Sequence, residues 1–357
     1  MQIIMVENDK CRLMSEYFDF NQISYSKSNL WDPDVDTFGR HVLNFDFHQV
    51  DSILLIVNTQ ILFTLYSWSK TKDQLVDFCN NGNKIWVHDD IDSLVNLVYL
   101  SHEYDLVTLD HLVPTGSIRI FLDGELSDRH PLTKLNNIKI SVLPYNFCLH
   151  RPRIQNSQCE KTDCSRDFML TMRKKITAPH RSILYSQLGA RDGLMQMGHV
   201  NYTNGNNRIG KQSTQHTWHD GFPSMDLYQD SWLEIVPETL YKHGFFVTEK
   251  TVKPLATKTP FLVVSTCRYL AYLKKFGFQT FGSVIDESYD QQPRLEDRVR
   301  MMLDQLEEIV RNGTESFYHS CRHILEHNQS RLFEISGRKE YDLDIFLRQC
   351  LEQDNVL

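Results

Sequence analysis

Three consecutive polar residues ahead of a short apolar segment offer the first candidate chemistry. Thr248, Glu249 and Lys250 follow a run of aromatic residues, and Lys253 lies one helical turn later. Thr248 is placed to cap a helix, since its hydroxyl can accept an amide hydrogen that the first turn leaves unpaired. Glu238, upstream, follows directly on a strand-like apolar run. The pattern predicts a strand, a loop and a helix that present two carboxylates and two ammonium groups.

These side chains suit a nucleotide site. At the open end of a doubly wound sheet, helix N-termini point into the crevice where nucleotides bind. A carboxylate there, Glu238 or Glu249, can accept both hydroxyls of a ribose, and a lysine can offset the charge of a diphosphate leaving group. A threonine followed by glutamate and lysine is also an ordinary helix start, with the glutamate near the positive end of the helix dipole. Spacing alone leaves both interpretations open.

A basic cluster opens the second half of the chain. Arg173, Lys174 and Lys175 follow the strand predicted for 168–172, and Arg181 lies in the first turn of the helix predicted for 180–188. Such a cluster between domains either contacts phosphate groups or is simply solvated.

A general base would come from the first half of the chain. His88, Asp89 and Asp90 end the strand predicted for 84–87, where a carboxylate or imidazole could reach an acceptor hydroxyl. Acidic strand ends are also common loop caps. A rival pair, Asp123 with Glu125, is structural or faces the acceptor, and its spacing could also suggest a divalent-metal motif. A separate loop set could bind a metal through its histidines and aspartate or stack a tryptophan on a sugar or base, but such a loop more often only orders over the substrate: His216, Trp218, His219 and Asp220.

The elements that position these residues alternate along the chain. Predicted strands lie at 2–6, 52–57, 84–87, 118–122, 138–143, 168–172, 231–236 and 260–265, with helices at 180–188 and 248–256. Residues 149–164 are predicted as a linker and 193–230 as a long surface excursion. After Pro293 the chain becomes helical: one helix ends at Gly313, a second has Phe317, Cys321, Ile324, Leu325 and Leu332 on one face, and a third covers 341–351.

This order predicts an α/β fold of two Rossmann-like domains that face each other across a cleft, with C-terminal helices. The N-terminal domain covers 1–155, the nucleotide-binding domain 165–335, and a helix within 336–357 is expected to pack back on the first domain. A length of 357 residues suits two domains, and a hydrophobic content of 41% is ordinary for globular proteins.

Composition narrows the partners and the compartment. The net charge of -8 argues against a protein that coats nucleic acid through a basic surface. The chain has neither a long apolar run nor a signal-peptide pattern, so we expect a cytoplasmic protein without a membrane partner. Eight scattered cysteines, of which only Cys159 and Cys164 are close, are expected to be reduced thiols.

Beyond these patterns, the segments 231–239, 245–254 and 260–264 resemble the donor-binding half of GT-B glycosyltransferases, especially α-1,3-fucosyltransferase-like sequences. That family carries a glutamate at a strand end, then Thr-Glu-Lys opening a helix, then a strand that starts with proline. The continuation, with 270–274, 277–281 and 286–290, looks like a glycosyltransferase-like group frequent in phages and bacteria. Residues 167–175 with 179–181 are similar to the strand, loop and helix that open the same domain.

The resemblance implies a nucleoside-diphosphate sugar donor, carrying UDP or GDP, and transfer of its sugar to a hydroxyl acceptor. We expect no essential metal, because the donor architecture of the metal-dependent glycosyltransferase fold is missing and a basic cluster surrounds Arg173. Glu249 and Glu238 would hold the ribose. Arg173, Arg181 and Lys250 would hold the diphosphate, with Lys174 or Lys175 as substitutes. The segment 84–92 resembles the phage DNA β-glucosyltransferase around its catalytic aspartate, which implies Asp90 as the base of an inverting transfer.

The acceptor would be a glycan, a protein or hydroxymethylated DNA. A DNA acceptor needs a positive cleft, which Arg151, Arg153, Lys161, Arg166 and the cluster 173–175 could line. The alternative is a non-catalytic nucleotide-binding or glycan-binding protein on the same fold. A nucleotide-hydrolysing enzyme is less favoured because the chain has no Walker-type glycine-rich loop.

Overall fold

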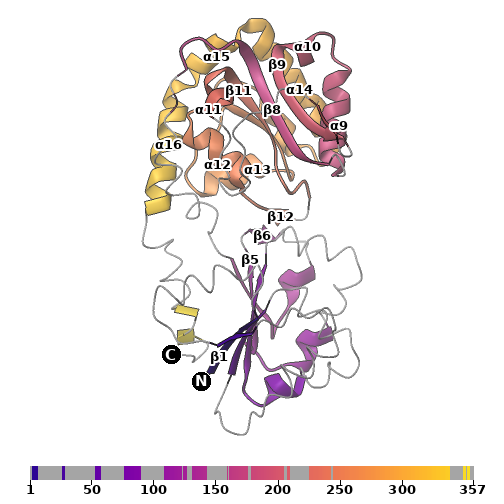
Figure 1. Ribbon diagram of the computed structural model, residues 1–357, viewed down its shortest axis with the longest axis vertical. Helices are drawn as coiled ribbons and strands as arrows, with labels where there is room; N and C mark the ends of the chain where they lie inside the picture. The colour runs from indigo at the N-terminus through magenta and orange to yellow at the C-terminus, as the bar shows by residue number, and fades with distance from the viewer. Residues whose placement is uncertain are drawn as a thin grey trace. The chain divides into compact units, whose positions relative to one another are not determined.

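In the computed structural model, the described residues are 2–6, 26–28, 53–57, 76–89, 108–122, 124–126, 131–142, 159, 161–175, 178–204, 207–209, 225–242, 244–337, 349–350 and 352–353. The chain divides into two compact units (Figure 1). Unit 1 comprises Met1–Tyr145 with Lys339–Leu357, and unit 2 comprises Asn146–Arg338. Both are mixed α/β structures built on parallel strands.

Unit 1 is built on a six-stranded sheet in which all neighbouring strands are parallel. Its strands, in spatial order, are β2 (Ser26–Ser28), β1 (Gln2–Val6), β3 (Ile53–Val57), β4 (Lys84–Asp89), β5 (Ile118–Leu122) and β7 (Lys139–Val142). Every residue of β5 is buried, as expected for a parallel strand covered on both faces. The order of strands reverses between β1 and β3. The unit also contains β6 (Glu125–Leu126) and the 3-10 helix η2 (Pro131–Lys134).

The predicted strands of this half are confirmed. Those at 2–6 and 118–122 have the predicted bounds, and the others differ by one or two residues at an end. Long runs of isoleucine, leucine and valine make such strands recognisable, because branched side chains fit a pleated, buried surface.

Unit 2 is built on a five-stranded sheet whose order is β10 (Asn207–Ile209), β9 (Gly198–Asn204), β8 (Arg166–Lys175), β11 (Ser231–Pro237) and β13 (Phe261–Val264). Only the edge strand β10 is antiparallel to its neighbour. The chain adds strands first on one side of β8 and then on the other, so the strand order reverses between β8 and β11. In open α/β sheets, ligands bind outside the carboxyl ends of the strands at such a switch point.

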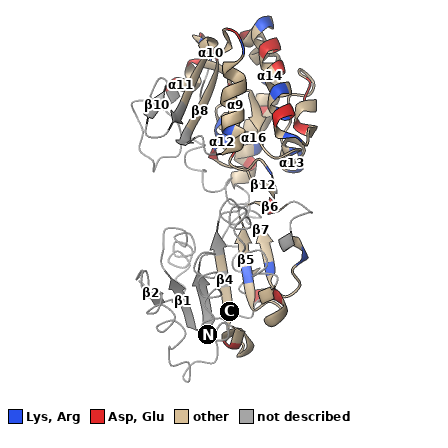
Figure 2. Cartoon of the chain, turned by 90° about the vertical axis from the view of Figure 1, so that its right-hand side faces the viewer, with Lys and Arg blue, Asp and Glu red and all other residues tan. Residues whose placement is uncertain are grey.

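Helices cover both faces of this sheet (Figure 1). On one face α9 (Pro179–Gly189) packs against α14 (Leu295–Asn312), and on the other α12 (Glu249–Ala256) packs against α16 (Arg322–Gly337). Right-handed crossovers that run in opposite directions from the switch point produce this arrangement. Acidic and basic residues are both frequent along α14 (Figure 2). The remaining elements are α10 (Leu194–Met197), α11 (Met225–Gln229), β12 (Gly244–Phe245), α13 (Tyr269–Lys275), η4 (Ser288–Gln291) and α15 (Thr314–Ser320).

The prediction of a surface excursion at 193–230 is wrong for the residues that the structure describes, whereas 205–206 and 210–224 lie outside them. This stretch supplies α10, α11 and the strands β9 and β10. Gly198 lies so close to the Phe168 ring that an added Cβ would stand 2.4 Å from it, and the imidazole of His199 is buried. The sequence of β9 is mostly polar and does not show the pattern of a buried strand, and the strand forms through its pairing with β8.

Two further predictions need correction. The second C-terminal helix is divided at Cys321 into α15 and α16, whereas the helix that ends at Gly313 is confirmed and Gly313 has φ of 97°. Part of the predicted linker packs into unit 2: Lys161 is buried, and Cys159 lies in a buried cluster with Met169, Leu227 and Tyr228. The helix predicted for 341–351 falls almost wholly outside the described residues. Among the helices of the described ranges, none combines the length and apolar character needed to span a membrane.

Candidate functional site

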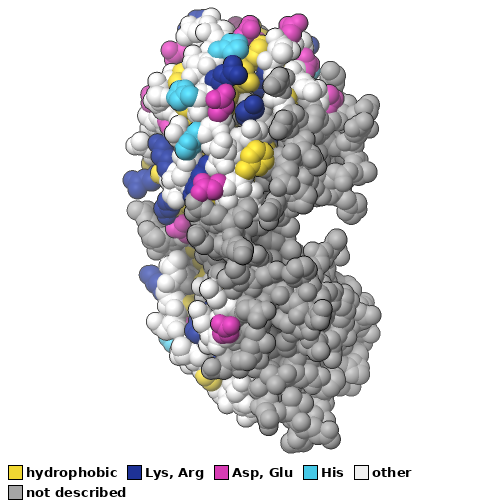
Figure 3. All heavy atoms as spheres, turned by 90° about the vertical axis from the view of Figure 1, so that its left-hand side faces the viewer, with side chains coloured by type: hydrophobic (Ala, Val, Ile, Leu, Met, Phe, Trp, Pro, Cys, Tyr) yellow, Lys and Arg dark blue, Asp and Glu magenta, His cyan; other side chains and the backbone are white. Residues whose placement is uncertain are grey.

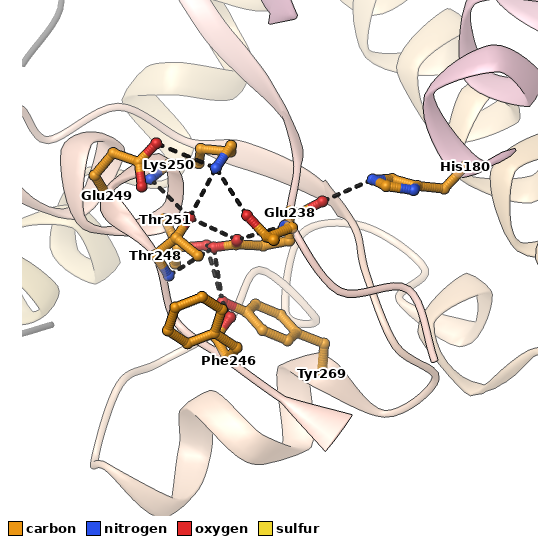
Figure 4. Close-up of polar contacts among 9 residues, drawn as sticks. His180, Glu238, Phe246, Thr248, Glu249, Lys250, Thr251 and Tyr269 are labelled. Carbon is orange, nitrogen blue, oxygen red and sulfur yellow. Dashed lines mark hydrogen bonds and ion pairs between the residues drawn. The ribbon is translucent and has the colours of Figure 1, made fainter. Parts of the chain in front are cut away.

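The switch point of unit 2 gathers most of the predicted nucleotide-binding residues. β8 ends at Lys175 and β11 at Pro237, and the two strands are parallel neighbours, so both end at the same edge of the sheet. The N-termini of α9 and α12 follow these strand ends. A direct hydrogen bond joins the start of α9 to the end of β11: His180 Nε2, in the first turn of α9, lies 2.7 Å from the carbonyl oxygen of Glu238 (Figure 4).

Glu238 is fully buried at this edge. Its Oε1 accepts hydrogen bonds from Thr248 N, Thr251 Oγ1 and Tyr269 OH at 3.1, 2.6 and 3.1 Å, and its Oε2 accepts from Thr239 N and Thr248 Oγ1 at 3.0 and 2.7 Å. An ionised carboxylate has about four lone-pair sites, so protein donors use its whole accepting capacity. In this arrangement Glu238 holds the starts of α12 and α13 to the end of β11 and does not present an oxygen to a ribose.

Glu249 and Lys250 occupy the start of α12. The predicted cap is confirmed, since Thr248 Oγ1 accepts a hydrogen bond from Lys250 N at 3.2 Å. The Lys250 ammonium donates to Thr239 Oγ1, Thr248 Oγ1 and Glu249 Oε1 at 3.0, 3.2 and 3.1 Å. Partial burial raises the pKa of Glu249, but the ammonium groups of Lys250 and Lys253 and the hydrogen bond from Lys250 outweigh it and hold the pKa at about 2. Glu249 is therefore ionised across the physiological range, with 37% of its side chain exposed.

His180 is a neutral imidazole inside a cationic surrounding. Burial, together with the charges of Arg181, Lys250 and Arg298, lowers its pKa to about 3, against the backbone hydrogen bond to Glu238. A carbonyl oxygen can only accept, so Nε2 carries the proton and donates to Glu238. The ring stacks on Tyr241 with centroids 5.0 Å apart. Three cations therefore lie close enough to this buried ring to disfavour its protonation.

Arg298 is the member of this site that the sequence analysis missed. It lies on α14 with 2% of its surface exposed, and it donates to the carbonyl oxygens of Gln292 and Tyr241. Burial lowers its pKa, against the nearby charge of Asp290. A signal was available: residue 298 falls on the apolar stripe of Leu295 and Met302, where an arginine must be satisfied by partners inside the protein.

Other predicted residues are placed only in part. Arg173, Lys174 and Lys175 are the last residues of β8, at the switch point, but their side chains fall outside what is described. Arg181 is on α9 with 6% exposure, and Lys253 lies one turn into α12.

The predicted base lies in the part of the chain that forms unit 1. His88 and Asp89 end β4, with their side chains undescribed, whereas the switch point of that sheet lies between β1 and β3. Glu125 lies in β6. The remaining candidates fall outside the described residues: Asp90, Asp123, His216, Trp218, His219 and Asp220.

Of the basic residues proposed to line a DNA cleft, those that the structure describes do not lie together on one surface. Lys161 is 7% exposed, and its ammonium donates to the carbonyl oxygens of Tyr228 and Ser231. Arg166 starts β8 and Lys175 ends it, which separates their backbones by roughly 30 Å at the usual rise of a strand. On the face of unit 2 in Figure 3, acidic, basic and histidine side chains are interspersed and form no continuous basic band. Arg151 and Arg153 are not among the described residues.

A cavity of about 500 Å³ lies elsewhere in unit 2, between the loop that contains Asp286 and the α14–α15 junction. It borders Gly313, next to Thr314, whose hydroxyl bonds to Asp167 near the start of β8. Its lining includes Asp286 and Glu308 and no lysine or arginine, so its charge is wrong for a diphosphate. Within the described ranges, no group of three or more histidine, cysteine, aspartate or glutamate side chains could hold a metal ion.

No protein-family model matches the chain, and no curated protein sequence matches it significantly. The candidate site therefore stands on its topology, hydrogen bonds and charges.

Proposed function

We propose that the protein is a glycosyltransferase that binds a nucleoside-diphosphate sugar at the carboxyl edge of unit 2. The observation that carries the proposal is the meeting, at one topological switch point, of the N-termini of α9 and α12 with a cluster of cations. Helix N-termini and positive charge at this position are what a diphosphate requires. Glu249, ionised and part-exposed beside Lys250, is the carboxylate available for ribose hydroxyls.

In this proposal Arg173, Lys250 and Lys253 hold the diphosphate, Glu249 holds the ribose, and Thr248 and Glu238 fix the start of α12. Arg181 contributes positive field from its buried position. Unit 1 supplies the acceptor side of a GT-B arrangement, with Asp90 as base and Asp89 or His88 as its neighbours. The hydroxyl acceptor is a glycan, a protein or modified DNA, and the transfer is inverting and independent of metal. These assignments rest on the resemblance and on the chemistry that each side chain allows.

The competing proposal is a protein that binds the same nucleotide without catalysis. Both proposals share the fold, so turnover has to separate them.

A thermal-shift screen against UDP- and GDP-sugars, followed by a hydrolysis assay on the hits, tests the proposal. A donor present at 100 times its Kd stabilises the folded chain by about 2.7 kcal/mol, which is an easily measured shift. We expect one donor to raise Tm, and Glu249→Ala and Arg173→Ala to lose that shift. Binding without hydrolysis or transfer would favour the non-catalytic alternative, and no shift with any donor would contradict both.

A further inference from the structure

Helix α16 carries two exposed histidines, His323 and His327. Histidine side chains are visible on the face of unit 2 in Figure 3, the side on which Figure 1 places α16. Residues four apart on a helix lie on the same face, one turn above the other. Ile324 and Leu325, between them in the sequence, are buried. The outer side of the helix therefore presents two neighbouring imidazoles to solvent.

Two imidazoles at this spacing suit one metal ion. Zinc peptidases use the spacing in the segment His-Glu-x-x-His and in the inverted order His-x-x-Glu-His, which the sequence His323-Ile-Leu-Glu-His327 matches. Neutral imidazole is a common ligand of Zn²⁺, Ni²⁺ and Cu²⁺. The glutamate of such a segment serves as a general base, whereas Glu326 is paired with Arg322 at 3.1 Å. The match therefore supports metal binding and not hydrolysis.

A hydrogen bond prepares His327 as a ligand. Its Nε2 lies 3.0 Å from the carbonyl oxygen of Gly277, which can only accept, so Nε2 carries the proton and Nδ1 keeps its lone pair. Metal-binding histidines almost always donate their other ring N–H in this way, which fixes the tautomer. The loop that supplies the carbonyl is held by the same helix, because Asn328 bonds to both the N and the O of Gln279 at 2.8 Å. One donor atom is therefore set in advance.

The arginine charges on either side of the pair are offset. Arg322 is paired with Glu326, and Arg331 is paired with Glu334 at 2.6 Å, so each charge has an opposite charge at short range. Among the described residues, His323 has no hydrogen-bond or ion-pair partner. Its imidazole is therefore available to a cation.

We propose that His323 and His327 form a site for one divalent transition-metal ion of the Zn²⁺, Ni²⁺ and Cu²⁺ class, with Nδ1 of His327 as one donor atom. Two imidazoles leave coordination positions for water, so the site needs no third side chain. A bound ion would cross-link two turns of α16. The transfer proposed above does not depend on this site.

Titration calorimetry of the full chain, without an affinity tag, with NiCl₂ tests the site. In the wild type we expect one Ni²⁺ ion whose affinity falls at least about tenfold in His323→Gln and in His327→Gln. Loss of a group that merely supports a metal ligand already costs about 10- to 100-fold. Ni²⁺ should also raise Tm of the wild type more than that of either variant, since it binds the folded chain.

His111→Gln is the matched control. His111 is also exposed, but no histidine lies four residues from it in either direction. The control should leave the Ni²⁺ affinity unchanged, which excludes an effect of losing any exposed histidine. Melting curves without metal show whether the variants fold, and replacing His323 removes no described hydrogen bond or ion pair.

Two results would overturn the proposal. One is equal Ni²⁺ affinity in the wild type and in both α16 variants. The other is a loss in His319→Gln and His323→Gln but not in His327→Gln, which would place the ion one turn earlier, beside the pair of His319 with Glu315. Neither result bears on the donor site.

Discussion

The two sheets of this chain reverse their strand order in different places, and the difference decides how far each candidate site can be argued. In unit 2 the reversal lies between β8 and β11, the two strands whose ends lead into the residues predicted to bind phosphate and ribose. In unit 1 it lies between β1 and β3, whereas His88 and Asp89 end β4, one strand farther along. Topology therefore supports the donor site and gives weaker support to the predicted base. Mutations of the donor-site residues and of the predicted base should therefore have different effects.

The largest expected effect concerns catalysis. If Asp90 is the base, Asp90→Asn should lower kcat by about 100- to 10,000-fold, the range typical for loss of a general base. The Kd for the donor should stay unchanged, because donor binding is assigned to unit 2. Steady-state kinetics with calorimetry measure both quantities. An unchanged kcat would move the search for the base to the strand ends of β1 and β3.

The next largest effect separates the two glutamates of unit 2. Glu238→Ala leaves the hydroxyls of Thr251 and Tyr269 and the amide of Thr248 without their acceptor, so we expect a loss of about 3 kcal/mol or more in unfolding free energy. Glu249→Ala should cost less than about 1 kcal/mol, because its pair with Lys250 is part-exposed. Urea unfolding gives both values. Equal losses would refute the division between a supporting and a ligand-binding carboxylate.

Gly198→Ala tests the placement of β9. Its Cβ would stand 2.4 Å from the buried Phe168 ring, so we expect overpacking that costs about 1 to 3 kcal/mol. Gly82→Ala strains a positive φ of 85° but meets no atom within 4 Å, and serves as a comparison for backbone cost alone. Equal stability of the wild type and Gly198→Ala would mean that β9 does not pack on β8.

The last prediction concerns the pH dependence of the unfolding free energy. Burial raises the pKa of Glu234 to about 7, against the hydrogen bond from Tyr228 and the charges of Lys253 and Lys161. The folded chain keeps this proton where the unfolded chain loses it, so the stability that it contributes is present below about pH 4.5 and is lost as the pH rises to about 7. Glu249, with its pKa lowered to about 2, acts in the opposite sense: its contribution is lost as the pH falls below about 4.5.

Glu234→Gln should therefore remove part of the decline in stability between pH 4.5 and 7. Urea unfolding at several pH values, compared with the wild type, isolates this part from that of Asp290, whose pKa burial raises to about 6. Parallel curves for the two proteins would contradict the assignment.

The sequence predicted what local patterns encode. Apolar runs located the strands at 2–6 and 118–122, and the order of Thr248, Glu249 and Lys250 located the cap of α12. The sequence could not predict that protein donors occupy the whole Glu238 carboxylate, because one of these donors is Tyr269, in a helix that follows the next strand of the sheet. β9 was missed because pairing with β8 holds a polar segment that its own composition does not identify as a strand.

The most direct test of the donor site is hydrogen exchange measured with and without the UDP- or GDP-sugar that gives the largest thermal shift. We expect slower exchange in peptides that cover 173–182 and 238–250, the two segments that meet at the switch point of unit 2. Protection confined to 282–286 and 305–320, around the acidic cavity, would contradict the assignment of the donor to the carboxyl edge of this sheet.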